Sequence, residues 1–271
     1  MIEIDFTNKN VLITGGTKGI GLSSALNFAK AGAQTYLTYK WGMDDFTPLY
    51  QKFEEIDAIK PILIQSDVSV SEDTDALLEK IKEKKDKIDI FISNVGFAQR
   101  TMNLDEYKKR SLFKTLEYST WPLIEYTRKI KEKFGKYPSK ILAISSDGPD
   151  HFYIGYDYVA ASKALLEFFF KYLSVHLRKD GCTVNVIRFG PTNTESFNYI
   201  FGEDFFDYLR DNNIPVEVIM KPEECGKAVF GMCCDFFEPM NGQIVTVDRG
   251  FPFQDNVMMR YLESKNKNKD K

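Results

Sequence analysis

A glycine-rich segment lies near the N-terminus of this 271-residue chain, between an apolar run and an amphipathic stretch. It reads Val11-Leu-Ile-Thr-Gly-Gly-Thr-Lys-Gly-Ile-Gly21, so its glycines follow an expected strand and open an expected helix. Glycines permit a tight turn and a close approach of the backbone to a pyrophosphate, and the free N–H groups of a helix N-terminus bind anions. We therefore expect this segment to bind a dinucleotide, through Gly15, Thr17, Lys18, Gly19 and Ile20.

The end of the second apolar run indicates which dinucleotide binds. An acid at this place would bind the ribose 2′-hydroxyl of NAD, whereas a cation suits the 2′-phosphate of NADP. The run ends Thr38-Tyr39-Lys40, and the first acids beyond it, Asp44 and Asp45, are less well placed. Lys40 and Lys18 would neutralise a 2′-phosphate, so the sequence favours NADPH over NADH.

Short apolar runs alternate with amphipathic stretches along the whole chain. The runs expected to be strands are Asn10–Thr14, Thr35–Tyr39, Pro61–Gln65, Ile88–Ser93, Lys140–Ser145, Thr183–Arg188 and Gln243–Val247. The helical periodicity between them is clearest over Glu72–Lys84, Leu104–Phe134, Val159–Arg178 and Pro222–Asp235. This alternation predicts an α/β fold, a doubly wound parallel sheet of about seven strands with helices on both faces. Residues 1–264 are expected to form one domain, followed by a disordered basic tail at residues 265–271.

The composition argues against several classes of protein. With 36 Lys and Arg against 39 Asp and Glu, the net charge of −3 is not that of a general nucleic-acid binder. No apolar stretch reaches the roughly 18 residues of a transmembrane helix, and the N-terminus lacks a secretory signal pattern. The four cysteines form no Cys-x-x-Cys pair and only two histidines are present, so we expect no metal site. We interpret the chain as a cytoplasmic protein with reduced thiols.

The motifs that follow the other strands are similar to those of the short-chain dehydrogenase/reductase superfamily. Asp67-Val68, Ser93-Asn94-Val95-Gly96 and Gly190-Pro191 stand where that superfamily has its conserved motifs, and Thr14 precedes the glycine loop as it does there. The resemblance runs from Lys9 to Gly250. It implies a Rossmann-like fold and further cofactor contacts from Asp67, Val68, Asn94, Gly96, Lys163, Gly190, Thr192 and Thr194.

The segment before Lys163 departs from the Tyr-x-x-x-Lys motif of most members, because Val159 stands where their tyrosine would be. Tyr156 and Lys163 instead have the Tyr-x6-Lys spacing of the superfamily's enoyl-acyl-carrier-protein reductases, and Ser145 lies eleven residues before Tyr156, as in that branch. Because the chain also keeps an ordinary glycine loop, it most resembles the type III enoyl reductases.

This resemblance implies an NADPH-dependent reduction of the α,β double bond of an enoyl thioester, carried by acyl carrier protein or coenzyme A. Hydride addition to the β-carbon places negative charge on the thioester oxygen, and the Tyr156 hydroxyl would stabilise and protonate this enolate. The Lys163 ammonium would favour the phenolate form of Tyr156 and hold the nicotinamide ribose. Ser145 would hydrogen-bond the substrate or Tyr156, or would only cap the end of its strand.

Two other functions stay open. A ketoreductase would use Tyr158 or Tyr156 on a ketone, but ordinary ketoreductases have an active-site asparagine in the fourth helix, and no asparagine occurs between Leu104 and Arg128. A non-catalytic nucleotide-binding scaffold would not need Tyr156, Lys163 and Ser145 at these offsets. The roles of Tyr153, Tyr158 and His151 are not assigned by the sequence.

Aromatic residues concentrate between positions 150 and 210, which hold 15 of the 38. Part of this surplus lies in Glu195–Tyr208. The resemblance implies that this segment is a mobile substrate lid, and the alternative is an amphipathic helix packed on the core. Another part lies in Val159–Arg178, which is apolar beyond one face and matches a helix that pairs across a two-fold interface in the superfamily. We therefore expect a homodimer or homotetramer.

Overall fold

Seven parallel strands form one sheet in the part of the chain that the computed structural model describes, residues 4–41, 45–212 and 214–254. Their order is β3-β2-β1-β4-β5-β6-β7. The strands are β1 (Asn10–Ile13), β2 (Gln34–Tyr39), β3 (Ile62–Gln65), β4 (Ile90–Ser93), β5 (Lys140–Ser146), β6 (Thr183–Phe189) and β7 (Ile244–Val247). The predicted doubly wound, Rossmann-like sheet is confirmed. Its order changes direction between β1 and β4, where such sheets open a crevice at the carboxyl ends of the strands. The predicted tail at residues 265–271 lies outside the described residues.

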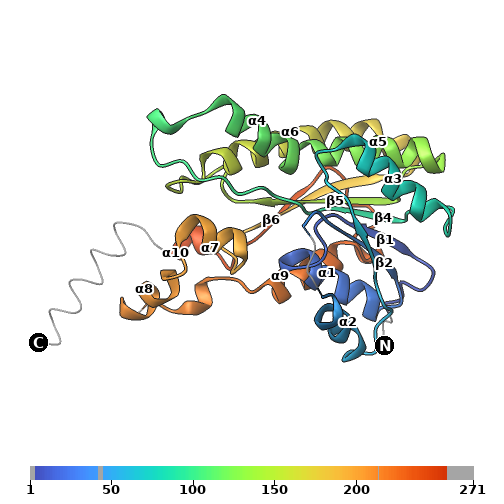
Figure 1. The fold of residues 1–271 in the computed structure, drawn as a ribbon, viewed down its shortest axis with the longest axis horizontal. Coiled ribbons are helices and arrows are strands. Elements are labelled where there is room, and N and C mark those ends of the chain that lie inside the picture. The colour runs from blue at the N-terminus through green and yellow to red at the C-terminus, as the bar shows by residue number, and fades with distance from the viewer. Residues whose placement is uncertain (1–3, 42–44, 213, 255–271) are drawn as a thin grey trace, which may run out of the picture.

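Helices cover both faces of the sheet (Figure 1). One face carries α1 (Gly19–Lys30), α2 (Thr47–Glu54) and α9 (Pro222–Met232), and the other carries α3 (Ser71–Lys82), α4 (Lys109–Ser119), α5 (Trp121–Phe134) and α6 (Asp157–His176). Three short helices lie together at one end of the molecule, and they are α7 (Glu195–Phe201), α8 (Phe205–Asp211) and α10 (Phe251–Gln254). Because α7 follows β6 and α10 follows β7, this group stands at the carboxyl ends of the strands.

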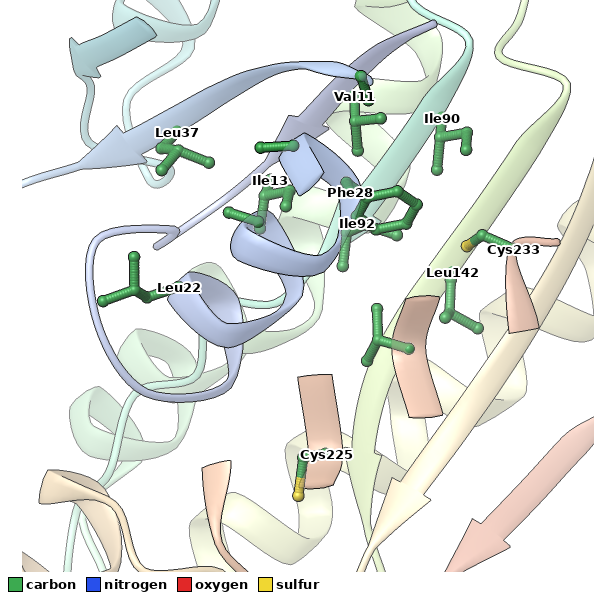
Figure 2. Packing of buried hydrophobic residues seen from close by; sticks show 14 of the residues in the cluster. Val11, Ile13, Leu22, Phe28, Leu37, Ile90, Ile92, Leu142, Cys225 and Cys233 are labelled. Carbon is green, nitrogen blue, oxygen red and sulfur yellow. The ribbon is translucent and has the colours of Figure 1, made fainter. Parts of the chain in front are cut away.

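The side chains of each central strand divide between two hydrophobic cores. Val11 and Ile13 of β1 belong to the core beneath α1 and α9, with Phe28 and Cys225 (Figure 2). Leu12, between them, belongs to the core beneath α5 and α6. Since successive strand residues face opposite sides and both sides are covered, these strands have the continuous apolar sequences from which they were predicted.

The prediction of one helical segment over Leu104–Phe134 was wrong. The structure has a 3-10 turn at Leu104–Glu106 and then two helices, α4 and α5, that meet at Thr120. Pro122 stands in the first turn of α5 and has no N–H to continue the hydrogen bonds of α4. The proline therefore ends one helix and begins the next.

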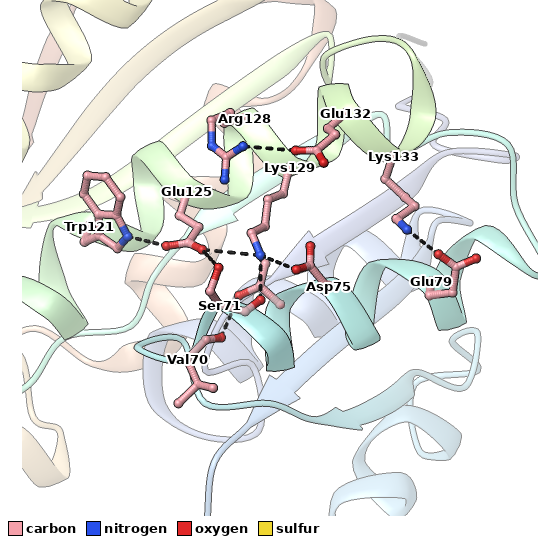
Figure 3. Close-up of polar contacts among 11 residues, drawn as sticks. Val70, Ser71, Asp75, Glu79, Trp121, Glu125, Arg128, Lys129, Glu132 and Lys133 are labelled. Carbon is pink, nitrogen blue, oxygen red and sulfur yellow. Dashed lines mark hydrogen bonds and ion pairs between the residues drawn. The ribbon is translucent and has the colours of Figure 1, made fainter.

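A line of polar contacts joins α5 to α3 (Figure 3). Lys129 is 4% exposed, and its ammonium lies 2.6 Å from the Asp75 carboxylate, 2.6 Å from the Ser71 carbonyl and 3.5 Å from Glu125. Glu125 also accepts hydrogen bonds from Ser71 and from the Trp121 indole. A buried ammonium is tolerated when its donors are satisfied in this way. The contacts fix α5, which leads into β5, against the neighbouring helix.

The outer face of α6 carries exposed apolar side chains. Phe168, Tyr172 and Val175 are 50%, 56% and 74% exposed. The helix is therefore apolar on its exposed face as well as on its buried face, as the sequence indicated. The homodimer or homotetramer expected from this apolar character stays a prediction. In the described part of the chain, every helix is too short or too polar to span a bilayer.

Candidate functional site

A cavity of about 560 Å³ opens at the carboxyl ends of β1, β4, β5 and β6. Of the residues predicted from the sequence to bind cofactor or act in catalysis, all but Asp67 and Val68 line it. They are Gly15, Thr17, Lys18, Gly19, Ile20, Lys40, Asn94, Gly96, Ser145, Tyr156, Lys163, Gly190, Thr192 and Thr194. Segments as far apart as residues 15 and 194 therefore meet at one place.

Asn94 holds the glycine loop in place. Its side-chain amide donates to the carbonyls of Thr14 and Gly15, at 2.9 and 3.1 Å, and its backbone N–H donates to the Thr14 hydroxyl at 3.0 Å. A Cβ on Gly21 would lie only 2.5 Å from the Gly15 carbonyl oxygen, so this close packing needs glycine. At Gly19, where φ is +56°, the nearest atom to such a Cβ is 3.9 Å away. The loop is thus packed on its inner side and open toward the cavity.

The two lysines expected to bind a 2′-phosphate both have acidic partners. The Lys40 ammonium lies 2.6 Å from the Asp67 carboxylate and also contacts the Tyr118 hydroxyl. Burial opposes ionisation of Asp67, but hydrogen bonds from Lys40 and Ser69 outweigh it and lower the pKa of Asp67. Lys18 is paired with Glu195 at the start of α7, where both side chains are exposed. Of the two predicted cofactor contacts that do not line the cavity, Asp67 is therefore bound to Lys40, and Val68 is buried in the core.

Tyr156 and Lys163 lie on the same wall of the cavity. Tyr156 directly precedes α6 and is partly buried against Gly148, where a Cβ would lie 2.6 Å from its ring. Lys163, one and a half turns into α6, is 6% exposed and donates to the Ile144 carbonyl at 2.7 Å. Burial lowers the pKa of Lys163 to about 8 and raises the pKa of Tyr156 to about 12. We had expected Lys163 to lower the pKa of Tyr156, but here burial of the phenol outweighs any such effect.

The two serines that end β5 make different contacts. The Ser145 hydroxyl donates to Glu167 at 2.6 Å, and Glu167 is paired with the Arg188 guanidinium. Ser145 is thus engaged with Glu167 rather than with Tyr156, and it is the neighbouring Ser146 that opposes the effect of burial on the Tyr156 pKa. Successive strand residues point to opposite sides, so the serine pair by itself signalled that only one could face Tyr156. Sequence reasoning missed Ser146, Glu167 and Arg188.

Tyr158 and Tyr153 have clearly different surroundings. Tyr158 is 3% exposed, does not line the cavity, and accepts a 2.6 Å hydrogen bond from the Lys108 backbone N–H. Tyr153 lines the cavity and donates to the Asp147 carboxylate at 2.6 Å. Its ring stands edge-on to that of Tyr156, with centroids 6.0 Å apart. Tyr153, rather than Tyr158, therefore accompanies Tyr156 in the cavity.

The segment Glu195–Tyr208 is divided between the cavity and a small core of its own. The cavity is lined by Phe197, Tyr199, Ile200 and Phe201. Phe205 and Phe206 pack instead with Phe197 and Leu209 in a separate cluster. The ring of Phe201 lies nearly parallel to that of Tyr156, with centroids 6.4 Å apart. Phe197 belongs to both sets, so this segment lines the cavity and packs as helices at once, while its role as a mobile lid stays a prediction.

Comparisons with known proteins concern the family of the chain as a whole. A family model described as enoyl-(acyl carrier protein) reductase matches residues 15–252. The chain is 28% identical to the enoyl-[acyl-carrier-protein] reductase [NADH] FabI of Aquifex aeolicus, over 90% of this chain and 91% of that protein. It is 26% identical to the 3-oxoacyl-[acyl-carrier-protein] reductase FabG of Chlamydia trachomatis, over 90% and 97%. A short-chain dehydrogenase from Burkholderia cenocepacia in complex with NADP superposes with a TM-score of 0.77, at 22% identity and over 91% and 98% of the two chains.

Proposed function

This chain belongs to the enoyl-(acyl carrier protein) reductase family of short-chain dehydrogenases/reductases, and from that premise we propose that it reduces the α,β double bond of an enoyl thioester with NADPH. The observation that carries this proposal is the position of Tyr156. Its side chain shares the cavity with Lys163 and the glycine loop, whereas Tyr158, the other candidate at this place, lies outside it.

The residues present fit a nicotinamide dinucleotide. The open side of Gly19 and the free N–H groups of α1 face the cavity, as a pyrophosphate requires. Lys163 lies across the cavity floor, with its ammonium 3.7 Å from where a Cβ on Gly96 would be, and would hold the ribose hydroxyls. The absence of an acid at the end of β2, together with Lys40 and Lys18, supports NADPH. Their ion pairs with Asp67 and Glu195 make the expected preference modest.

The cofactor, when bound, supplies the hydride that adds to the β-carbon of the substrate. Tyr156 remains protonated at neutral pH because its pKa is about 12, so it can donate a hydrogen bond to the thioester oxygen. Charge develops on that oxygen during hydride addition, and a donor placed there stabilises the transition state more than the ground state. Packing of the Tyr156 ring against Gly148 and Phe201 orients this donor.

The aromatic wall beside Tyr156 supports an acyl substrate. Phe201 stacks over Tyr156, and Phe197 packs against Phe201 with ring centroids 4.8 Å apart. An apolar wall next to a polar donor suits a thioester whose acyl chain is hydrocarbon and whose carbonyl is polar. We propose acyl carrier protein or coenzyme A as the carrier.

The test is to follow the absorbance of NADPH, and separately NADH, with crotonyl thioester and with acetoacetyl thioester. The proposal expects oxidation with the crotonyl substrate, and a lower KM for NADPH than for NADH. Turnover of the acetoacetyl substrate alone would establish the ketoreductase instead. Cofactor binding with no turnover of either substrate would establish a non-catalytic protein.

We also propose that the exposed apolar face of α6 is covered by a second copy of the chain. The double change Phe168→Ser and Tyr172→Ser should convert the dimer or tetramer to monomer, as measured by light scattering after gel filtration. The matched control is Phe113→Ser on α4, which is also 51% exposed. A monomeric native protein would contradict this assembly.

A further inference from the structure

Tyr153 and Asp147 form a polar pair on the cavity wall that the proposed mechanism leaves unused. Asp147 directly follows β5 and is 5% exposed, yet it is a carboxylate. Tyr153 donates to it at 2.6 Å from the loop that leads to α6. The ring of Tyr153 contacts those of Tyr156 and Phe201 edge-on, and both Tyr153 and Asp147 line the cavity beside them.

The Tyr153 hydroxyl can donate one hydrogen bond, and the protonation state of Asp147 determines which acceptor receives it. When Asp147 is ionised, it can only accept, so Tyr153 must donate to it and presents only lone pairs to the cavity. When Asp147 is protonated, its own O–H can donate to the Tyr153 oxygen. The proton of Tyr153 is then free to turn toward a ligand in the cavity.

We propose that Tyr153 is a second hydrogen-bond donor to the substrate oxygen served by Tyr156, and that protonation of Asp147 switches this donor on. The proposal rests on the proposed function, because it needs a substrate carbonyl beside Tyr156. It makes Tyr153 a catalytic residue and Asp147 a residue that positions the Tyr153 proton.

The groups around Asp147 make such a switch accessible. Burial raises the pKa of Asp147, the hydrogen bond from Tyr153 and the charge of His151 lower it, and Asp248, after β7, raises it. The net effect is to raise the pKa of Asp147 above its ordinary value, with burial as the largest cause. The His151 imidazole lies 3.9 Å from the carboxylate, with 39% of its side chain exposed, and its Nδ1 also contacts the Asp147 main-chain carbonyl. Tyr156 faces the same carboxylate from the start of α6.

The experiment measures kcat/KM for crotonyl thioester against pH, below the pKa of about 8 of Lys163. Wild type should lose about tenfold as the pH rises through the pKa of Asp147, the size of one hydrogen bond to a developing charge. At every pH, Tyr153→Phe should have the lower kcat/KM that wild type reaches only above the pKa of Asp147. Asp147→Asn should show no fall in kcat/KM over this pH range, because its amide does not titrate. His151→Gln should keep the fall but move its midpoint upward, because the imidazolium charge that lowers the Asp147 pKa is gone.

Tyr50→Phe is the matched control, because Tyr50 lies on α2 and does not line the cavity, and its pH profile should equal that of wild type. The proposal is overturned if Tyr153→Phe lowers kcat/KM by the same factor at all pH values, or if Asp147→Asn retains the fall.

A wild type inactive on crotonyl thioester would refute the proposed function rather than the switch. The carbon-13 resonance of the Asp147 carboxyl group, assigned with Asp147→Asn, then decides. Its titration midpoint should rise in Tyr153→Phe, because the tyrosine hydrogen bond that favours the carboxylate is lost. An unchanged midpoint would show that Tyr153 and Asp147 are not coupled.

Discussion

The two halves of the cavity are built in different ways. In the cofactor half, Asn94 and Thr14 bind main-chain atoms, and glycines are packed so closely that a single methyl group would clash. In the substrate half, side chains from the β5–α6 loop and α7 meet one another, as Tyr156 meets Phe201. The first half depends on backbone geometry and the second on residue identity. Dinucleotide binding therefore depends on a backbone shape that many side chains could accompany, whereas the reaction with a substrate depends on a few particular side chains.

The largest effect is expected in the substrate half, from Tyr156→Phe. This change removes the hydroxyl that we propose donates to the thioester oxygen, and it leaves the ring stacked on Phe201. Loss of one such donor lowers kcat by about 100- to 1000-fold. Cofactor affinity should be unchanged within about twofold, since the glycine loop is untouched. Steady-state kinetics with crotonyl thioester and fluorescence titration of NADPH measure the two quantities.

Tyr158→Phe is the control for that prediction. It removes a buried hydroxyl that accepts from the Lys108 N–H, so it should lower the free energy of unfolding by about 1 kcal/mol while kcat stays near wild type. A large loss of kcat in Tyr158→Phe with little loss in Tyr156→Phe would reverse our assignment of the two tyrosines.

The second effect is expected in the cofactor half, from Gly21→Ala. The added Cβ would lie 2.5 Å from the Gly15 carbonyl oxygen and 2.7 Å from the Asn94 amide nitrogen. Displacing these groups costs about 1–3 kcal/mol and distorts the loop. The Kd for NADPH should therefore rise about 10- to 100-fold, as measured by fluorescence titration. Gly231→Ala, where a Cβ meets no atom within 4 Å, should leave the Kd unchanged. Equal effects of the two changes would disprove that close packing is the reason for glycine at position 21.

The sequence predicted the cofactor half of the cavity better than the substrate half, because the first depends on backbone geometry and the second on individual side chains. Gly15, Asn94 and Gly190 come from motifs at strand ends, and a parallel sheet brings such ends together whatever the side chains do. The exchange of Ser145 for Ser146 depends on which way the end of β5 twists, and Glu167 reaches Ser145 only through tertiary packing. Neither contact can be predicted from the spacing of residues in the sequence. The helical periodicity also gave no sign that the helix ends at Thr120, although Pro122 indicates a new helix there.

A smaller effect is expected from Phe201→Ala. The change removes a ring that covers Tyr156 and packs on Phe197, so it opens the apolar wall of the cavity. KM for a long-chain enoyl thioester should rise by about tenfold, the value of one lost apolar contact of roughly 1–1.5 kcal/mol. KM for crotonyl thioester should change little. Phe236→Ala, on an exposed residue far along the chain, serves as the control. Equal rises for both substrates would mean that Phe201 orders the site rather than contacts the acyl chain.

The smallest effect is expected in the cofactor half, from the side chains that we propose set the preference for NADPH over NADH. Asp67→Asn removes the carboxylate that holds Lys40, and so should raise the ratio of kcat/KM for NADPH to that for NADH by about three- to fivefold. Lys40→Ala should lower this ratio by a similar factor, and Lys60→Ala should not change it. The ratio isolates the 2′-phosphate, because any contact of Asp67 with the adenine affects both cofactors equally. If Lys40→Ala leaves the ratio unchanged, Lys40 serves only to hold Asp67 and Tyr118. Cofactor choice would then have to come from elsewhere in the loop, such as Lys18, whose exposed pair with Glu195 is the easier of the two to exchange for a phosphate.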